Sequence, residues 1–261
     1  MHARFPHPQK EEDMLKLSLP TTGVHQTAIH GAESLTFGIE IVDKLFGQLK
    51  MGELAVFHGS QMCHVLSELL CVRSQLPNVE GGLGSSAVFI DGCNRFNPYL
   101  ISENARLLGL DPEETLKNIW VSIAFTSYQL TALIAEKLLE TINRVKPKLV
   151  VVSDVAALYC DSDIGLFEAK RTFNRVVCFL WNLARERNLL LVVTSFSSAN
   201  WRKRLLEQYL LGRSDVAAKI EEGNPHVKLK LEKHPSKPAV SVELLFDEPK
   251  NQFLLEEFME V

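Results

Sequence analysis

The sequence lacks a long apolar run and a signal peptide. Its longest apolar runs, Lys148–Val152 and Leu189–Val193, are far too short to span a bilayer. The polar start MHARFPHPQKEED has no apolar region of the kind that secretory signals contain. We therefore expect an intracellular, cytoplasmic protein that makes no membrane contact.

Cysteine and positive charge are also scarce. The five cysteines are scattered and never spaced as CxxC, so neither a disulfide framework nor a zinc site is indicated. The 28 Lys and Arg residues are outnumbered by 32 Asp and Glu residues, and the formal net charge is −4. No global basic field attracts this chain to nucleic acid, so any DNA contact must be local.

What the sequence contains is an ordinary globular composition, with 46% hydrophobic and 23% charged residues among 261. Three prolines and a Lys-Glu-Glu-Asp run interrupt the first residues, which show no sustained period. We predict an N-terminal arm over residues 1–34 and one core domain over residues 35–261.

Short apolar runs alternate with longer helical patterns from Leu35 onward, which is typical of a parallel sheet covered by helices. The predicted strands are Leu54–His58, Ala87–Asp91, Ile119–Ala124, Leu149–Ser153 and Leu189–Ser195. The predicted helices are Met62–Ser74, Pro98–Leu108, Tyr128–Arg144 and Leu166–Arg187. The alternating runs HVKLKLEKH and AVSVELLF near the C-terminus predict an antiparallel extension of the sheet.

The segment ELAVFHGSQMCHVLSELL reads as a buried strand, a turn and a helix, which is the frame of a phosphate-binding loop. Only Gly59 and Ser60 resemble that loop. Cys63 and His64 or their neighbours stand where lysine and Ser or Thr are expected, so no lysine would reach a phosphate.

Two long strings, LPNVEGGLGSSAVFIDGCNRFNP and ARLLGLDPEETLKNIWVSIAFTSYQL, resemble the RecA/RadA recombinase superfamily, and archaeal RadA in particular. The resemblance covers about Leu35 to Phe246. It implies a RecA-like, doubly wound, mostly parallel α/β sheet, which agrees with the strand alternation. Members of the family hydrolyse ATP, so the resemblance also implies where each catalytic group should lie.

Several of those groups differ in this chain. Cys93 replaces the glutamate that activates the attacking water, and a thiol cannot serve as a carboxylate base. At the end of the strand that positions magnesium, Ser153 precedes Asp154, which inverts the usual order. Asp154 either reaches a metal or is a capping or turn residue. The polar pair that senses the γ-phosphate is replaced by Ser195 and Phe196.

These replacements predict a degenerate site with no ATP hydrolysis and no cofactor. ATP with magnesium, held by a divergent loop, is the alternative. His64, Cys63 and Cys93 also invite a metal or thiol-nucleophile interpretation, but three soft ligands without a fourth favour packing residues.

Two segments correspond to the family's DNA-binding loops. The first, YCDSDIGLFEAK, is acidic, which is the wrong sign for phosphate. The second, FSSANWRKRLLEQ, offers a stacking ring and positive charge for weak contact with single-stranded DNA, or else forms a solvated helical turn. Its candidate residues are Trp201, Arg202, Lys203 and Arg204.

The family assembles filaments through a linker strand with an aromatic-x-x-Ala motif. Val24–Ala28 supplies an alanine without the aromatic anchor, so self-polymerisation is not expected and the oligomeric state stays open. We hypothesise a RadA-like paralogue that assists or regulates homologous recombination or DNA repair, with a RadA-type recombinase or another protein as its partner. The alternatives are an active ATPase of the RecA or KaiC kind and a peptide-binding module that uses the emptied nucleotide cleft.

Overall fold

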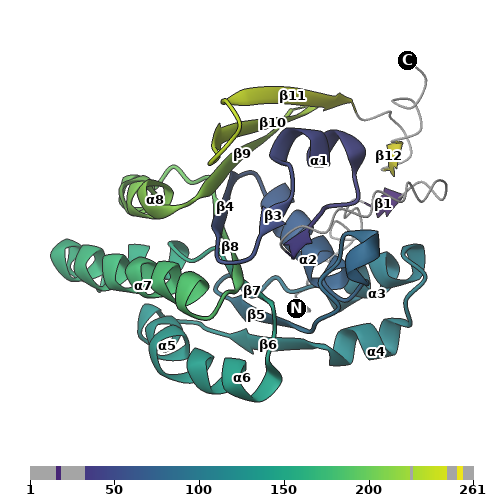
Figure 1. The fold of residues 1–261 in the computed structure, drawn as a ribbon. Coiled ribbons are helices and arrows are strands. Elements are labelled where there is room, and N and C mark those ends of the chain that lie inside the picture. The colour runs from purple at the N-terminus through teal and green to yellow at the C-terminus, as the bar shows by residue number, and fades with distance from the viewer. Residues whose placement is uncertain (1–15, 19–32, 224–225, 246–251, 255–261) are drawn as a thin grey trace, which may run out of the picture.

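The computed structural model describes residues 16–18, 33–223, 226–245 and 252–254. An eight-stranded sheet runs through the molecule, with helices on both of its faces (Figure 1). The boundary between arm and core stays a prediction, because most of residues 1–34, including Val24–Ala28, lies outside the described ranges.

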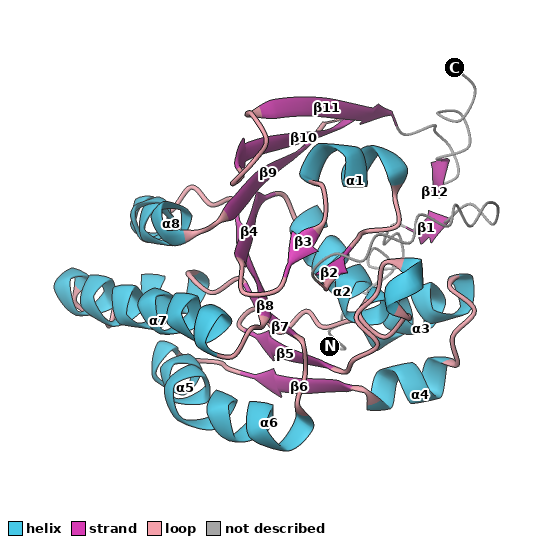
Figure 2. Ribbon diagram, viewed as in Figure 1, coloured by secondary structure: helices cyan, strands magenta, loops and turns pink. Residues whose placement is uncertain are grey.

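The central sheet has the order β11-β10-β9-β4-β8-β7-β5-β6. The neighbouring strands β9, β4, β8, β7, β5 and β6 pair parallel in that order. Strand β10 pairs antiparallel with β9 on one side and with β11 on the other. The predicted mostly parallel sheet with an antiparallel C-terminal extension is thereby confirmed (Figure 2). Its strands are β4 Leu54–Gly59, β5 Ala87–Asp91, β6 Ile119–Ile123, β7 Leu149–Ser153, β8 Leu190–Phe196, β9 Val216–Glu222, β10 His226–Lys233 and β11 Val240–Leu245.

Two small sheets accompany the central one. Strand β2 (Ser34–Leu35) pairs antiparallel with β3 (Leu49–Lys50), and β1 (Lys16–Ser18) pairs parallel with β12 (Gln252–Leu254). The second pair brings segments from the two ends of the chain together.

The helices follow the predicted pattern with three additions. The α-helices are α1 Glu40–Phe46, α2 Met62–Arg73, α3 Pro98–Leu107, α4 Pro112–Lys117, α5 Ser127–Ala132, α6 Leu138–Val145, α7 Leu166–Glu186 and α8 Trp201–Arg213. Short helical turns occupy η1 Asn78–Glu80 and η3 Ala157–Cys160, and a π-helical segment, η2 Leu133–Lys137, joins α5 to α6. Helices α1, α4 and α8 were not predicted. None of the helices in the described ranges is long and apolar enough to cross a bilayer.

Helices cover both faces of the central sheet, and successive residues of each strand point to opposite faces. In β4, Phe57 belongs to the core cluster under α1, α2 and α3, whereas Val56 belongs to the cluster under α5, α6, α7 and α8. The same division separates Phe89 from Val88 in β5. Continuous apolar strands are therefore required, and they are what made these strands visible in the sequence.

Helix α1 is tied to this core by aromatic packing. The rings of Phe37, Phe46 and Phe57 lie 5.4 to 5.8 Å apart, centroid to centroid, and all three are fully buried. Arg73, at the end of α2, donates hydrogen bonds to the carbonyl oxygens of Thr36 and Glu80. Together these contacts fix the segment that precedes the first central strand.

We expect Phe46→Ala to lower the free energy of unfolding by about 3–5 kcal/mol, since it removes a buried ring and leaves a cavity among aromatic neighbours. Chemical denaturation measures the change. Phe167→Ala is the matched control because that ring is 79% exposed, and its effect should stay within about 0.5 kcal/mol. Equal losses in the two variants would contradict this account of the core.

Candidate functional site

The turn that follows β4 is held tightly against β9. Gly59 has φ +115°, and a Cβ atom there would lie 2.1 Å from the carbonyl oxygen of Ile220. The Ser60 amide donates a 2.7 Å hydrogen bond to that same oxygen. The turn therefore needs glycine, and its first amide is already bound within the chain.

The N-terminus of α2 is likewise occupied by groups of the chain. The Met62 amide lies 3.2 Å from both the Ser60 hydroxyl and a carboxylate oxygen of Glu222. The Cys63 amide donates to the Ser60 carbonyl, and the Cys63 side chain is fully buried. Helix N-termini attract anions, and here the anion is a carboxylate from β9.

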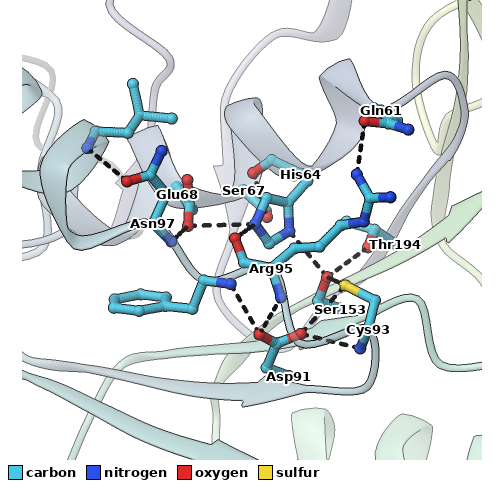
Figure 3. A network of polar contacts seen from close by, with 12 residues as sticks. Gln61, His64, Ser67, Glu68, Asp91, Cys93, Arg95, Asn97, Ser153 and Thr194 are labelled. Atoms are coloured by element: carbon cyan, nitrogen blue, oxygen red, sulfur yellow. Dashed lines mark hydrogen bonds and ion pairs between the residues drawn. The ribbon is translucent and has the colours of Figure 1, made fainter. Parts of the chain in front are cut away.

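His64 joins three elements at the carboxyl ends of the strands (Figure 3). Its Nδ1 lies 3.0 Å from the Ser153 hydroxyl at the end of β7. Its Nε2 lies 2.9 Å from the Arg95 carbonyl oxygen and 3.2 Å from Glu68 Oε1. Burial alone would lower the pKa of His64, but the hydrogen bond and negative charge of Glu68 raise it above its usual value.

Glu68 is completely buried one helical turn after His64. Its Oε1 also accepts a 2.6 Å hydrogen bond from the Asn97 amide, while its Oε2 has no partner among the described residues. Burial raises the pKa of Glu68 even though His64 opposes the shift. The folded pair therefore holds protons more strongly than the two separated side chains do.

Asp91, at the end of β5, is surrounded by backbone donors. Its carboxylate accepts hydrogen bonds from the amides of Cys93, Arg95 and Phe96 at 2.8 to 3.0 Å. Burial alone would raise the pKa of Asp91, but these amides lower it. The Cys93 sulfur lies 3.1 Å from Asp91 and 3.3 Å from the Ser153 hydroxyl, and burial raises the pKa of that thiol to about 12. Cys93 is accordingly a neutral thiol at physiological pH.

The Asp154 amide joins this network through the Thr194 hydroxyl, but the Asp154 carboxylate makes its contacts outside it. It has φ +45°, so the chain turns sharply after Ser153, and its carboxylate accepts the Phe196 amide at 3.0 Å. Lys203 Nζ lies 2.6 Å from the same carboxylate, and both side chains are buried. The sequence left Asp154 between a metal ligand and a turn residue, and here it is a turn residue whose charge is balanced by lysine.

The sequence left Trp201, Arg202, Lys203 and Arg204 between a DNA-binding loop and a solvated helical turn, and in the structure they make the first turn of α8. Asn200 caps that helix by accepting the Arg202 amide, and apolar residues follow at helical spacing. Lys203 is not available to a phosphate, since Asp154 requires its charge. A helical turn at this segment was expected to pack Trp201 on the core, but the Trp201 side chain is 56% exposed.

The network therefore unites His64 and Cys93 from the predicted site residues, while Asp154 and Lys203 form a separate pair. Sequence reasoning missed Glu68 and Glu222. The four-residue spacing of His64 and Glu68 on one helix could have revealed the first, but nothing local marks Glu222. No group of three His, Cys, Asp or Glu side chains in the described ranges is arranged to hold a metal ion.

The pair of His64 and Glu68 makes stability depend on pH. Both groups have raised pKa values in the folded state, so the folded chain keeps protons that the unfolded chain releases. The stability advantage of the wild type over His64→Gln/Glu68→Gln should therefore shrink as the pH rises, with the Glu68 contribution lost from about 4.5 upwards and the His64 contribution lost from about 6.5 upwards. Its slope should not exceed about 1.4 kcal/mol per pH unit for each proton.

Denaturation midpoints at several pH values measure this advantage. His234→Gln is a control of opposite sign, because burial and the Lys237 charge lower the pKa of His234. The advantage of the wild type over that variant should grow as the pH rises towards 6.5. A flat profile for the double variant would contradict the arrangement of the pair.

Comparison with known proteins places this architecture in a family. A DNA repair and recombination protein RadA from Aeropyrum pernix is 34% identical over 168 residues, which are 62% of this chain and 49% of that protein. The chain thus spans about half the length of the curated relative it matches. The Rad51 family model matches residues 20–224, which include the turn after β4 and every parallel strand of the central sheet, but neither β10 nor β11. The chain belongs to the Rad51 family and is a member of the RecA/RadA recombinase superfamily.

Proposed function

We propose that this chain is a RadA-like paralogue that does not hydrolyse ATP and acts as an accessory or regulatory protein in homologous recombination or DNA repair. The observation that supports the proposal is that the polar groups of the site are already hydrogen-bonded to other groups of the same chain. The Ser60 and Met62 amides are bound by Ile220 and Glu222, and the Ser153 hydroxyl is bound by His64.

The residues at this turn do not fit a magnesium triphosphate. The Glu222 carboxylate at the N-terminus of α2 would repel phosphate oxygens, and no lysine stands in the turn to offset it. Ser153 offers a hydroxyl where a carboxylate would hold the metal. Opening the network would leave the fully buried Glu68 without His64, and breaking a buried ion pair costs about 3–5 kcal/mol.

The position of the general base is similarly unsuited to catalysis. Cys93 is a neutral thiol that contacts Asp91 and Ser153, so it is too weak a base to accept a proton from a water molecule. Loss of a general base typically slows such a reaction by ~10²–10⁴-fold. Asp91 does not substitute for it, since its oxygens already accept three backbone amides.

A surface for a recombinase partner is available at β6. This strand ends the central sheet, and β5 is its only neighbour in the described part of that sheet. Trp120, Val121 and Ile123 are 38% to 43% exposed there. Exposed apolar edge strands recruit extended segments of other chains, so β6 suits the linker strand of a RadA-type recombinase.

For ATP we expect neither detectable binding nor phosphate release above buffer. Isothermal titration with ATP and magnesium measures the first, and a colorimetric phosphate assay measures the second. The Aeropyrum pernix RadA serves as the reference protein under the same conditions. Micromolar binding with steady turnover would establish the divergent ATPase instead.

For the partner we expect that Val121→Asp/Ile123→Asp weakens binding to the recombinase of the same host by at least about tenfold, which equals ~1.4 kcal/mol. Charges at these positions would oppose burial of an apolar strand. Biolayer interferometry with immobilised recombinase measures the affinity. Tyr99→Asp is the matched control, because Tyr99 is 84% exposed on α3. Unchanged affinity of the double variant would remove β6 from the proposal.

A further inference from the structure

A groove lies beyond the carboxyl ends of β6 and β7, away from the network around His64. Its volume is about 520 Å³. It is bounded by the start of α5, by η3 and the residues after it, and by the residue that caps α8. The lining residues come from the segments that follow three strands of the sheet and are Phe125, Thr126, Ser127, Tyr128, Ala157, Leu158, Cys160, Asp161, Asp163, Ile164 and Asn200.

Aromatic side chains are concentrated on and around this groove. Phe125 and Tyr128 line it and are 65% and 66% exposed. Phe167, at the start of α7, is 79% exposed, and Trp201 directly follows the lining residue Asn200. Two exposed aromatic rings thus line the groove and two more follow its lining residues in the chain, and aromatic residues dominate binding energy at interfaces.

The groove is acidic. Asp161 and Asp163 line it, and Glu168 lies within 3.4 Å of the Tyr128 hydroxyl, whereas no lysine or arginine is among the lining residues. The Arg202 guanidinium donates to the carbonyl oxygens of Asp161 and Ile164 and keeps its positive charge there, so the carboxylates of Asp161, Asp163 and Glu168 outnumber it. The local charge therefore favours a cation and opposes a phosphate backbone.

We propose that this groove binds a basic segment of a partner protein in which lysine or arginine residues alternate with apolar ones. The cationic groups would contact the two aspartates and the faces of Phe125 and Tyr128, since carboxylates and aromatic faces both attract ammonium and guanidinium groups. The apolar residues would cover the rings. This inference goes beyond the proposed function, because it requires neither an inactive nucleotide site nor a recombinase on β6.

The test uses a fluorescein-labelled 12-residue peptide of alternating lysine and leucine and measures its anisotropy with the full chain. A peptide with glutamate in place of lysine and a 20-nucleotide thymidine strand are the comparison probes. We expect binding of the lysine peptide only. Asp161→Asn/Asp163→Asn should weaken it by about three- to tenfold, because each exposed charge contributes modestly.

The asparagine substitutions keep the oxygen of residue 161 that accepts the Asp163 amide, so the local turn is preserved. Glu136→Gln/Glu186→Gln is the charge-matched control on exposed helix positions and should bind as the wild type does. Phe125→Ser/Tyr128→Ser should weaken binding at high salt as well, since ring contacts are not screened. Equal binding of the glutamate peptide, preference for the thymidine strand, or unchanged affinity of the aspartate variant would overturn the proposal.

Discussion

The imidazole of His64 is the contact on which the centre of this molecule depends. It connects α2 to the end of β7 through Ser153 and to the segment after β5 through the Arg95 carbonyl. An unsatisfied buried polar group costs about 1–3 kcal/mol, so a smaller side chain at this position would leave several such costs at once. Glu68 lies beside the ring, and the pair lets a carboxylate remain fully buried. The arrangement of three elements around one side chain explains why the strand ends meet so closely.

Charge balance extends the same principle to the rest of the strand ends. Lys203 balances the charge of Asp154, backbone amides stabilise the charged carboxylate of Asp91, and Glu222 accepts from the N-terminus of α2. Each of these groups would otherwise be an isolated charge or dipole in a poorly hydrated place. The described strand ends thus hold their charges in matched sets, and a bound triphosphate with its metal would have to displace several of them together.

The sequence predicted the parallel strands from β4 to β8 almost to the residue, because most of them are apolar runs buried on both faces, although the edge strand β6 is partly exposed. It left the first turn of α8 open between a basic loop and a helical turn, and the Asn200 cap decides for the helix. The site was harder still. Ser153 is 89 positions from His64, and Glu222 is 160 positions from Met62, so no local period marks these pairs. Family resemblance identified the positions that differ, but not the contacts that the substituted residues make.

These contacts also explain why the residues that differ from the family's nucleotide site depend on one another. Cys63, in α2, is fully buried in the apolar core cluster, so the longer side chain of a lysine would overpack this space. An aspartate in place of Ser153 would stand beside Cys93 and close to Asp91, whose carboxylate already carries charge. The tight turn at Gly59 would still press against Ile220 and leave its amides bound. A single substitution back to the family's residue would therefore conflict with the residues that now surround that position. The turn after β4, the N-terminus of α2 and the strand ends would have to change together before a phosphate could bind.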